Sequence, residues 1–294
     1  MPTIHYHRAS MSRSDSSSVP FEIVPLGRFG AEIFGIDLSR PFDEAAVAGL
    51  RRALVDHQIL IVRGQRLPPA DQLRLARCFG EPEPGIARRP ESHQVSGHPN
   101  VLYLSNKPGS PTVDYGVAWH SDGLAYARVP HGITMLHCIA CPSGVGATLF
   151  ANQFLAYEAM SPGFRNLLKD LYWYLPPIPF SEVPPGRGLA QPIVRAHPVT
   201  GRRFVFCAPG TRQLRGLSRQ ESEGILKTVY ACQVRETVIY RHDWCELDVV
   251  LWENCGLLHN RADVVDFGRQ GLRAMHRVAT SGNFAAIECE AAED

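Results

Sequence analysis

The chain has 294 residues, of which 45% are hydrophobic and 20% are charged. Its 30 basic side chains almost balance 29 acidic ones, so the net charge of +1 leaves no surplus of Lys and Arg for binding nucleic acid or an anionic membrane. No apolar run approaches the roughly 18–20 residues that a transmembrane helix needs. The length and composition are those of a globular protein able to bury a core, and they favour an enzyme.

Residues 1–20 are polar and rich in serine, and we expect them to form a flexible tail ahead of one domain over residues 21–294. The tail lacks the apolar segment of a secretion signal, so we expect a cytoplasmic protein. Its eight cysteines are then expected to be mostly free, buried thiols. Cys138 and Cys141 form a CxxC pair next to an apolar strand, which favours core residues over a zinc site.

In chain order, residues 21–36 alternate apolar and polar positions around glycines, which predicts short strands and a turn. From Val101 onward, short apolar segments separated by Gly, Pro, Asn and Ser indicate a sandwich or barrel. The remaining elements follow from helical or strand periodicity. Helices are expected at 44–57, 70–79, 152–160, 162–171 and 218–231, the last with a capping box, and strands at 59–62, 248–252 and 274–280, with a hairpin at 195–206.

Residues 175–192 contain six prolines and no periodic apolar pattern. A long stretch of this kind in a compact domain is often a lid over a binding site. We therefore expect a lid-like insertion there.

Three segments combine residues that can do chemistry. Trp119-His120-Ser121-Asp122 places a histidine and a carboxylate two positions apart, so on a strand they would face the same side. His259 follows a second apolar strand, and Arg273 lies fourteen residues beyond it. Two histidines and one carboxylate form the facial triad that binds Fe(II). Each piece alone is weak, because an isolated HxD is usually a surface pair and an isolated histidine is usually a core residue.

The sequence resembles the TauD/TfdA family of Fe(II)- and 2-oxoglutarate-dependent dioxygenases. The resemblance covers nearly the whole chain after the tail, and the order and spacing of its motifs carry it. These motifs are Gly35-Ile-Asp-Leu-Ser39, Ile61-Val-Arg-Gly64, Arg77-Cys-Phe-Gly-Glu81, Trp119-His-Ser-Asp122, Gly146-Ala-Thr-Leu-Phe150, His197-Pro-Val-Thr-Gly201, Leu251-Trp-Glu-Asn254 with His259, and Arg273-Ala-Met-His-Arg277. The family implies a double-stranded β-helix (jelly roll, cupin-like) that is mainly β with flanking helices.

The resemblance also implies roles for single residues. His120, Asp122 and His259 would bind Fe(II), while Thr148 and Arg273 would hold the far carboxylate of the cosubstrate 2-oxoglutarate. Oxygen would be the second cosubstrate, 2-oxoglutarate would be decarboxylated to succinate, and the default reaction would be hydroxylation of an unactivated C–H bond. Desaturation, cyclisation and C–N chemistry, as in natural-product tailoring, stay open because the motif cannot choose among them.

The substrate is expected to be a small acidic or amino-acid-derived molecule. Arg277 would contact its acidic group or else support Arg273, and Tyr103, Asn106 and Tyr126 are further candidates for substrate contact. His276 would lie on the opposite face of the same strand, in a structural role. Family members often assemble as dimers or tetramers, so a homo-oligomer is open here.

One departure from the family narrows the expected substrate, and one agreement with it narrows the expected reaction. No histidine follows Phe79-Gly-Glu81 until His93, although taurine enzymes use histidines there, so taurine is not the expected substrate. Asp122 is present, which leaves no ligand position for a halide and disfavours halogenation.

The sequence leaves three other interpretations of the protein's function open. A zinc hydrolase or lyase could use the same two histidines and aspartate, but it would leave Arg273 and Thr148 unexplained. A non-catalytic jelly-roll binding protein would tolerate loss of these residues, and all five are intact. An extracellular disulfide-linked module would need its cysteines paired.

Overall fold

The computed structural model describes residues 19–83, 91–113, 115–124, 127–175 and 187–290. The chain enters through strands β1 (Glu22–Pro25) and β2 (Ala31–Phe34), which pair antiparallel. Helix α1 (Glu44–His57) then leads to the buried strand β3 (Ile59–Val62), which lies parallel to β2. The α1 helix begins where predicted because the Asp43 carboxylate accepts a hydrogen bond from the Ala46 N–H.

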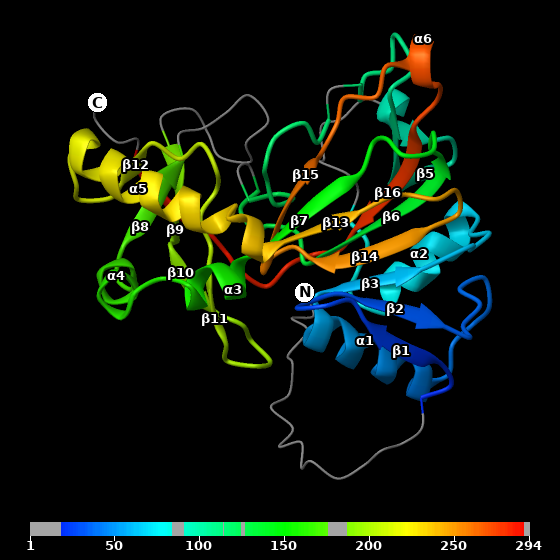
Figure 1. Cartoon of the computed structure of the whole chain (residues 1–294), viewed down its shortest axis with the longest axis horizontal. Helices are drawn as coiled ribbons and strands as arrows, with labels where there is room; N and C mark the ends of the chain where they lie inside the picture. The colour runs from blue at the N-terminus through cyan, green and yellow to red at the C-terminus, as the bar shows by residue number, and fades with distance from the viewer. Residues whose placement is uncertain (1–18, 84–90, 114, 125–126, 176–186, 291–294) are drawn as a thin grey trace.

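Two facing sheets form the core of the fold (Figure 1). The large sheet has eight strands in the order β1-β2-β3-β14-β6-β16-β5-β4, and the small sheet has the order β13-β7-β15. The further strands of the large sheet are β4 (Gln94–Val95), β5 (His98–Ser105), β6 (Ile133–Ala140), β14 (Val249–Glu253) and β16 (Ala274–Ala279). Those of the small sheet are β7 (Thr148–Asn152), β13 (Ile239–His242) and β15 (Leu257–Arg261). The predicted jelly roll, mainly β with flanking helices, is confirmed.

Strict alternation of side chains gives the large sheet two apolar faces. In β14, Val249 and Leu251 join the core formed with α1 and α2 (Pro69–Arg77), whereas Val250 and Trp252 join the core formed with β7 and β15. Because both faces of these strands are buried, their sequence is a continuous apolar run. One of these faces, with Val250 and Trp252, lines the space between the two sheets.

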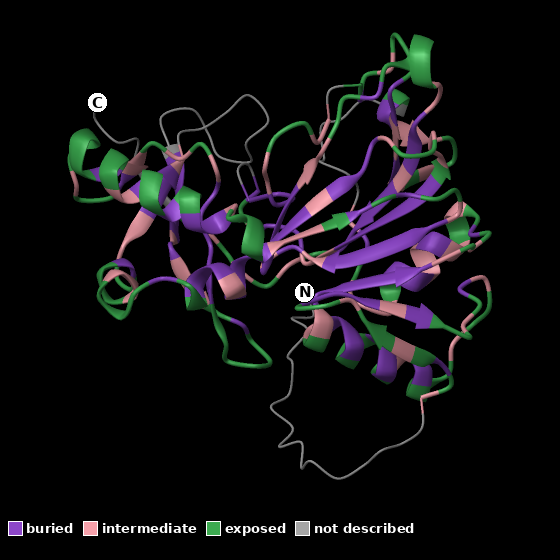
Figure 2. Cartoon of the chain, viewed as in Figure 1, coloured by how far each residue is buried: buried purple, intermediate pink, exposed green. Residues whose placement is uncertain are grey.

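A second layer of smaller elements packs beside the sandwich around its own apolar cluster (Figure 2). It contains the four-stranded sheet β12-β8-β9-β17, the predicted hairpin β10–β11 and three helices. Their bounds are α3 (Gln153–Glu158), α4 (Pro162–Leu168), β8 (Tyr172–Leu175), β9 (Arg187–Pro192), β10 (Val194–Ala196), β11 (Arg203–Val205), β12 (Gln213–Leu214), α5 (Arg219–Gln233) and β17 (Ile287–Glu290). Short helical segments occur at η1 (Glu91–His93), η2 (Glu236–Val238) and α6 (Phe267–Gln270). Helix α5 starts with the predicted Ser218–Glu221 capping box.

Several expectations need correction. Strand alternation is not what brings His120 and Asp122 together, since only His120 makes a bridge, to His259, and a turn begins at Asp122. The predicted lid over 175–192 ends in a regular strand, because residues 187–192 are β9, paired with β8. Residues 176–186 of that segment, and residues 1–18 of the expected tail, lie outside the described residues.

The cysteines were expected to be free and mostly buried; the structure agrees that the cysteines it describes are free, but not all of them are buried. It shows seven of the eight cysteines, all except Cys289, as free thiols, and Cys138 is fully buried in the core. Cys245 is exposed, however, because it lies in the turn that precedes β14. None of the helices within the described ranges is long and apolar enough to cross a bilayer.

A polar cluster lies under α2, on the face of the large sheet that points away from the small sheet. The buried Gln72 amide nitrogen is 2.7 Å from the Leu67 carbonyl, 3.1 Å from His137 Nδ1 and 3.0 Å from His276 Nδ1. Because His137 Nε2 donates to the Gln65 carbonyl, its Nδ1 is an acceptor, so the cluster requires neutral imidazole. The predicted structural role of His276 agrees with this placement.

This cluster predicts acid-sensitive stability. Burial lowers the pKa of His137, and burial with the nearby charges of His137 and His98 lowers the pKa of His276 to about 4. The unfolded chain therefore takes up protons below about pH 6.5 that the folded chain does not, and stability falls as the pH falls from 6.5 toward 4. In urea unfolding, His276→Gln should reduce the loss between pH 7.5 and pH 5 by about 1 kcal/mol, since partial solvent exposure weakens the full effect. His57→Gln, at the accessible end of α1, serves as the control, and an unchanged slope in His276→Gln would contradict the assignment.

Candidate active site

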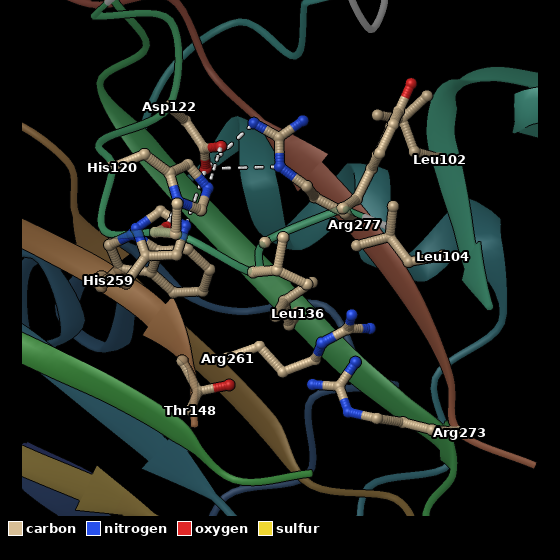
Figure 3. A pocket seen from close by; sticks show the side chains of 15 residues that line it. Leu102, Leu104, His120, Asp122, Leu136, Thr148, His259, Arg261, Arg273 and Arg277 are labelled. Atoms are coloured by element: carbon tan, nitrogen blue, oxygen red, sulfur yellow. Dashed lines mark hydrogen bonds and ion pairs between the residues drawn. The ribbon is translucent and has the colours of Figure 1, made fainter. Parts of the chain in front are cut away.

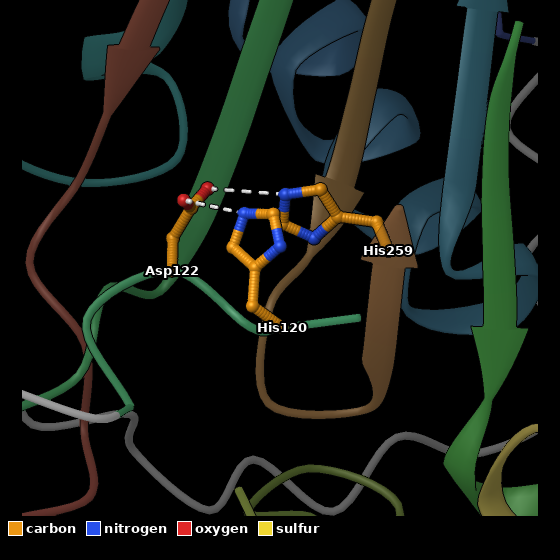
Figure 4. Close-up of side chains that lie close together, drawn as sticks. All are labelled: His120, Asp122 and His259. Atoms are coloured by element: carbon orange, nitrogen blue, oxygen red, sulfur yellow. Dashed lines mark ion pairs between the residues drawn. The ribbon is translucent and has the colours of Figure 1, made fainter. Parts of the chain in front are cut away.

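His120, Asp122 and His259 converge between the two sheets, as the sequence predicted (Figure 4). His120 and His259 are joined by two backbone hydrogen bonds, of 3.0 and 2.8 Å, which place their rings 4.1 Å apart. The His120 Nε2 atom is 3.9 Å from one Asp122 oxygen, and the His259 Nε2 atom is 3.8 Å from the other. The three ligand atoms therefore surround one point, although the HxD segment is a bridge followed by a turn.

The surroundings of the two histidines suit them to bind a metal ion. His120 Nδ1 lies 2.7 Å from the Ala118 carbonyl and must donate its proton there, which leaves the Nε2 lone pair facing Asp122. His259 packs against the rings of Phe150 and Trp252, which fix its orientation. Burial and the neighbouring His120 lower the pKa of His259 to about 3, so its ring is neutral at physiological pH. Neutral imidazoles and a carboxylate are the donor set of a non-haem iron centre.

The Asp122 carboxylate is buried, and one of its oxygens, Oδ2, accepts hydrogen bonds from Thr134 and Arg277. Burial alone would raise its pKa, yet Arg277 and the two histidines hold that pKa well below its usual range. Arg277 Nη2 is 3.0 Å from Asp122 Oδ2, and the Thr134 hydroxyl donates to the same oxygen at 2.8 Å. Asn254 donates to Thr134 and in turn accepts from the Trp252 indole N–H. The Trp252-Glu-Asn254 motif thus positions a candidate metal ligand through Thr134.

A cavity of about 360 Å³ extends from this cluster between the sheets (Figure 3). Leu102, Leu104 and Leu136 form an apolar wall near Arg277, and Thr148, Arg261 and Arg273 occupy the far end. Burial lowers the pKa of Arg273 to about 10, which still leaves it charged at neutral pH. The cavity is therefore a largely apolar space with metal-binding groups at one end and cationic groups at the other.

Two residues hold the Arg273 side chain and backbone in place. Its Nε–H donates to the Gly146 carbonyl at 3.1 Å, which leaves the terminal Nη1 and Nη2 groups for a ligand. Gly146 has φ +72°, and a Cβ there would lie 2.8 Å from Arg273 Cδ. The Asn106 side chain accepts from the Arg273 N–H and donates to the carbonyls of Val265 and Gly271.

The structure separates the other substrate-contact candidates. Tyr103 points away from the cavity and packs its ring against His276, because its neighbours Leu102 and Leu104 take the inward positions of β5. Asn106 is buried and bonds to backbone groups, so it does not face the cavity. The structure thus places both side chains outside the lining of this cavity, and substrate contact by either one stays a prediction. Arg277 does line the cavity, and Tyr126 lies outside the described residues.

A second cluster with metal-like composition has a structural explanation. The ligand atoms of His197, Glu253 and Cys255 lie within 4.8 Å of one another. However, His197 Nδ1 accepts backbone N–H groups from Val199 and Thr200, so the ring proton is on Nε2, which donates to Glu253 at 2.9 Å. That Nε2 atom has no lone pair for a metal ion, and the pair instead fastens the β10–β11 hairpin to β14.

Sequence reasoning missed Arg261 and Thr134. Arg261 is two residues after His259 on β15, so strand alternation could have placed it on the same face as that candidate ligand. Thr134 gave no comparable signal, because its role depends on the pairing of β6 with β14.

Comparisons with known proteins agree with this site. The sequence profile described as "Taurine catabolism dioxygenase TauD, TfdA family" matches residues 22–279. An alpha-ketoglutarate-dependent sulfate ester dioxygenase of Pseudomonas putida is 28% identical in an alignment of length 275 that covers 87% of this chain and 87% of that one. An alpha-ketoglutarate-dependent 2,4-dichlorophenoxyacetate dioxygenase of Cupriavidus pinatubonensis is 26% identical in an alignment of length 256 that covers 79% of this chain and 88% of that one. A crystal structure of a taurine dioxygenase from Burkholderia xenovorans superposes with a TM-score of 0.79 at 27% identity, covering 93% of this chain and 96% of that one.

The jelly roll, the His-Asp-His cluster and these matches together define the class of protein as a 2-oxoglutarate-dependent non-haem iron dioxygenase; 2-oxoglutarate and alpha-ketoglutarate are the same compound. Within that class, the chain belongs to the TauD/TfdA family, because the family profile spans most of its length. The resemblance seen in its motifs is confirmed.

The hydrogen bond from Thr134 to Asp122 predicts an effect on metal affinity. Thr134→Val keeps the shape of the side chain but removes the donor, so the affinity for Fe(II) or Mn(II) should fall roughly 10- to 100-fold, as for other groups that orient metal ligands. Isothermal titration calorimetry of the metal-free protein with Mn(II) measures this change in affinity. Thr228→Val is the matched control, since its hydroxyl bonds only within α5 to the Gly224 carbonyl. Equal metal affinity in the two variants would show that Thr134 does not orient Asp122.

Proposed function

We propose that the protein binds Fe(II) through His120, Asp122 and His259, and that it couples the conversion of 2-oxoglutarate and O₂ to succinate and CO₂ with hydroxylation of an unactivated C–H bond in a small acidic or amino-acid-derived molecule. The observation that carries the proposal is the placement of a three-donor cluster and a buried arginine at opposite ends of one cavity. The iron would supply the oxidising chemistry, and the protein supplies position, charge and exclusion of water. A cytoplasmic location and a homo-oligomeric state stay predictions.

Arg273 and Thr148 suit the far carboxylate of 2-oxoglutarate. The terminal guanidinium nitrogens of Arg273 form a fork that matches the two oxygens of a carboxylate. The Thr148 hydroxyl accepts a hydrogen bond from the Trp244 indole N–H at 3.0 Å, which leaves its own proton to donate to the carboxylate. Both groups therefore present donors toward the same end of the cavity.

The other half of the cavity suits a substrate with apolar and acidic parts. Leu102, Leu104 and Leu136 offer an apolar wall, and Arg277 lies beside them near the metal-binding cluster. Arg277 is paired with Asp122, so it serves that carboxylate as well as any substrate. A guanidinium has five N–H donors, which is enough for both contacts. The relatives that act on sulfate esters and on 2,4-dichlorophenoxyacetate are named for acidic substrates, which supports this class.

The metal-binding role predicts loss of turnover. His120→Ala and Asp122→Ala should each abolish the substrate-stimulated release of succinate from 2-oxoglutarate, because each removes one of three ligands. The assay screens sulfonates, amino acids and aryloxy acids with the wild-type protein, and then compares the variants on the best substrate. Asp56→Ala, an exposed carboxylate on α1, is the control. Turnover in Asp122→Ala at the wild-type rate would rule out the proposed function.

The Gly146 contact predicts a selective effect on the cosubstrate. In Gly146→Ala the new Cβ collides with the Arg273 side chain and with Val265, so the KM for 2-oxoglutarate should rise roughly tenfold or more. Gly144→Ala is the matched control, because its φ of +75° is similar but no atom lies within 4 Å of the added Cβ. Both variants carry the same backbone strain, of about 1 kcal/mol. If the KM for 2-oxoglutarate rose equally in Gly146→Ala and Gly144→Ala, backbone strain and not displacement of Arg273 would be the cause.

A further inference from the structure

We propose that Arg261 is a second cationic ligand of the cosubstrate's far carboxylate, beside Arg273, and that it connects this carboxylate to the loop that lines the cavity next to His120. The inference rests on the proposed function, since it requires 2-oxoglutarate in the cavity. It adds a residue outside the motifs that identified the family.

The strand register brings Arg261 to this end of the cavity. Arg261 is the last residue of β15 and pairs directly with Thr148 on β7. Because side chains alternate along a strand, it shares a face with His259. Figure 3 shows its guanidinium group next to that of Arg273, with the Thr148 hydroxyl on the same side. Both arginines line the cavity.

Two guanidinium ions so close together favour an anion between them. Arg273 is only 7% exposed, and the charge of Arg261 acts with burial to lower the pKa of Arg273. Asp122, an acidic side chain of the lining, lies at the other end of the cavity. A carboxylate has two oxygens with about four acceptor positions, so it can accept hydrogen bonds from both arginines and from Thr148. Its negative charge would offset the repulsion between the two cations.

Arg261 is also attached to the loop that leads to His120. Its Nη1 and Nη2 groups each lie 3.3 Å from the Val113 carbonyl, and its backbone N–H donates to Gly116 at 2.7 Å. The next residues, Val117 and Ala118, line the cavity. Because a guanidinium has five N–H donors, Arg261 can keep the loop contact while it binds a carboxylate. Binding of 2-oxoglutarate would then hold the loop in the conformation seen here.

The test is an anaerobic titration of the Fe(II)-loaded protein with 2-oxoglutarate. Binding is monitored through the weak visible absorption that the Fe(II)–2-oxoglutarate complex gives. Arg261→Gln should raise the Kd for 2-oxoglutarate roughly 10- to 100-fold, the range expected for one lost charge-assisted contact. Arg261→Lys should lie between wild type and Arg261→Gln, since it keeps the charge but loses the fork. Arg269→Gln, on the short surface helix α6, is the control and should leave the Kd unchanged.

A second ligand shows whether Arg261 contacts the far carboxylate directly or whether its substitution disturbs the binding site in general. 2-Oxobutyrate carries the same 2-oxo acid group but no far carboxylate, so its affinity should barely change in Arg261→Gln. If Arg261→Gln does not fold, the ratio of the two affinities in Arg261→Lys provides the same test, and an unchanged ratio would overturn the inference. Absence of the absorption in the wild-type protein would instead overturn the proposed function, and the inference with it.

The loop connection has its own readout. Hydrogen exchange of residues 115–118 should slow when 2-oxoglutarate is added to the wild-type Fe(II) protein, and should not slow in Arg261→Gln at a saturating concentration of the ligand. Slowing by the same factor in both proteins would show that the cosubstrate acts on the loop without Arg261.

Discussion

The buried carboxylate of Asp122 is the constraint around which the site is built. An ionised carboxylate between two apolar sheets is costly unless charges and hydrogen-bond donors surround it. Here the donors come from separate elements: Arg277 from β16 and Thr134 from β6, with His259 on β15 facing the same oxygen. Asp122 therefore joins the two sheets electrostatically, and the charge of Arg277 favours its ionised form. Thr134 and Asn254 matter because they complete this shell.

Strand β16 determines the length of the cavity. Arg273, just before the strand, and Arg277 within it are four residues apart, about 13 Å along an extended chain. Both point between the sheets with Met275, while His276 and Val278 point toward α2 and its neighbours. One short segment thus places one arginine at the metal-binding end and another at the far end. The neutral cluster of Gln72, His137 and His276 contacts the same strand on the face that points toward α2. The position of the two arginines on the cavity face of β16 therefore depends on the stability of this cluster on the opposite face.

The order and spacing of the motifs, through their resemblance to a known family, were sufficient to predict five residues of the site, although each motif alone was weak. His120, Asp122, His259, Thr148 and Arg273 were named from motifs, and the fold brings all five to one cavity. Sequence reasoning was weakest where the pairing of distant strands decides which way a side chain points. Tyr103 was a candidate for substrate contact, but the register of β5 with β16 pairs Leu102 with Arg277 and turns Tyr103 to the other face. Asn106 was a further candidate, and its amide donates to backbone carbonyls that only the folded loop brings near.

Strand β15 shows why the two ends of the cavity cannot vary independently. It carries His259 at the metal-binding end and Arg261 at the cationic end, two residues apart on one face, and β16 likewise links Arg277 with Arg273. A shift of either strand would therefore displace a metal ligand or its support together with a cationic group. Since β15 and β16 belong to different sheets, the distance between these two strands depends on the packing of Phe150, Trp252 and Met275 between the sheets. The strands thus set the length of the cavity and the apolar core sets its width, and a 2-oxo acid with a far carboxylate would have to match both.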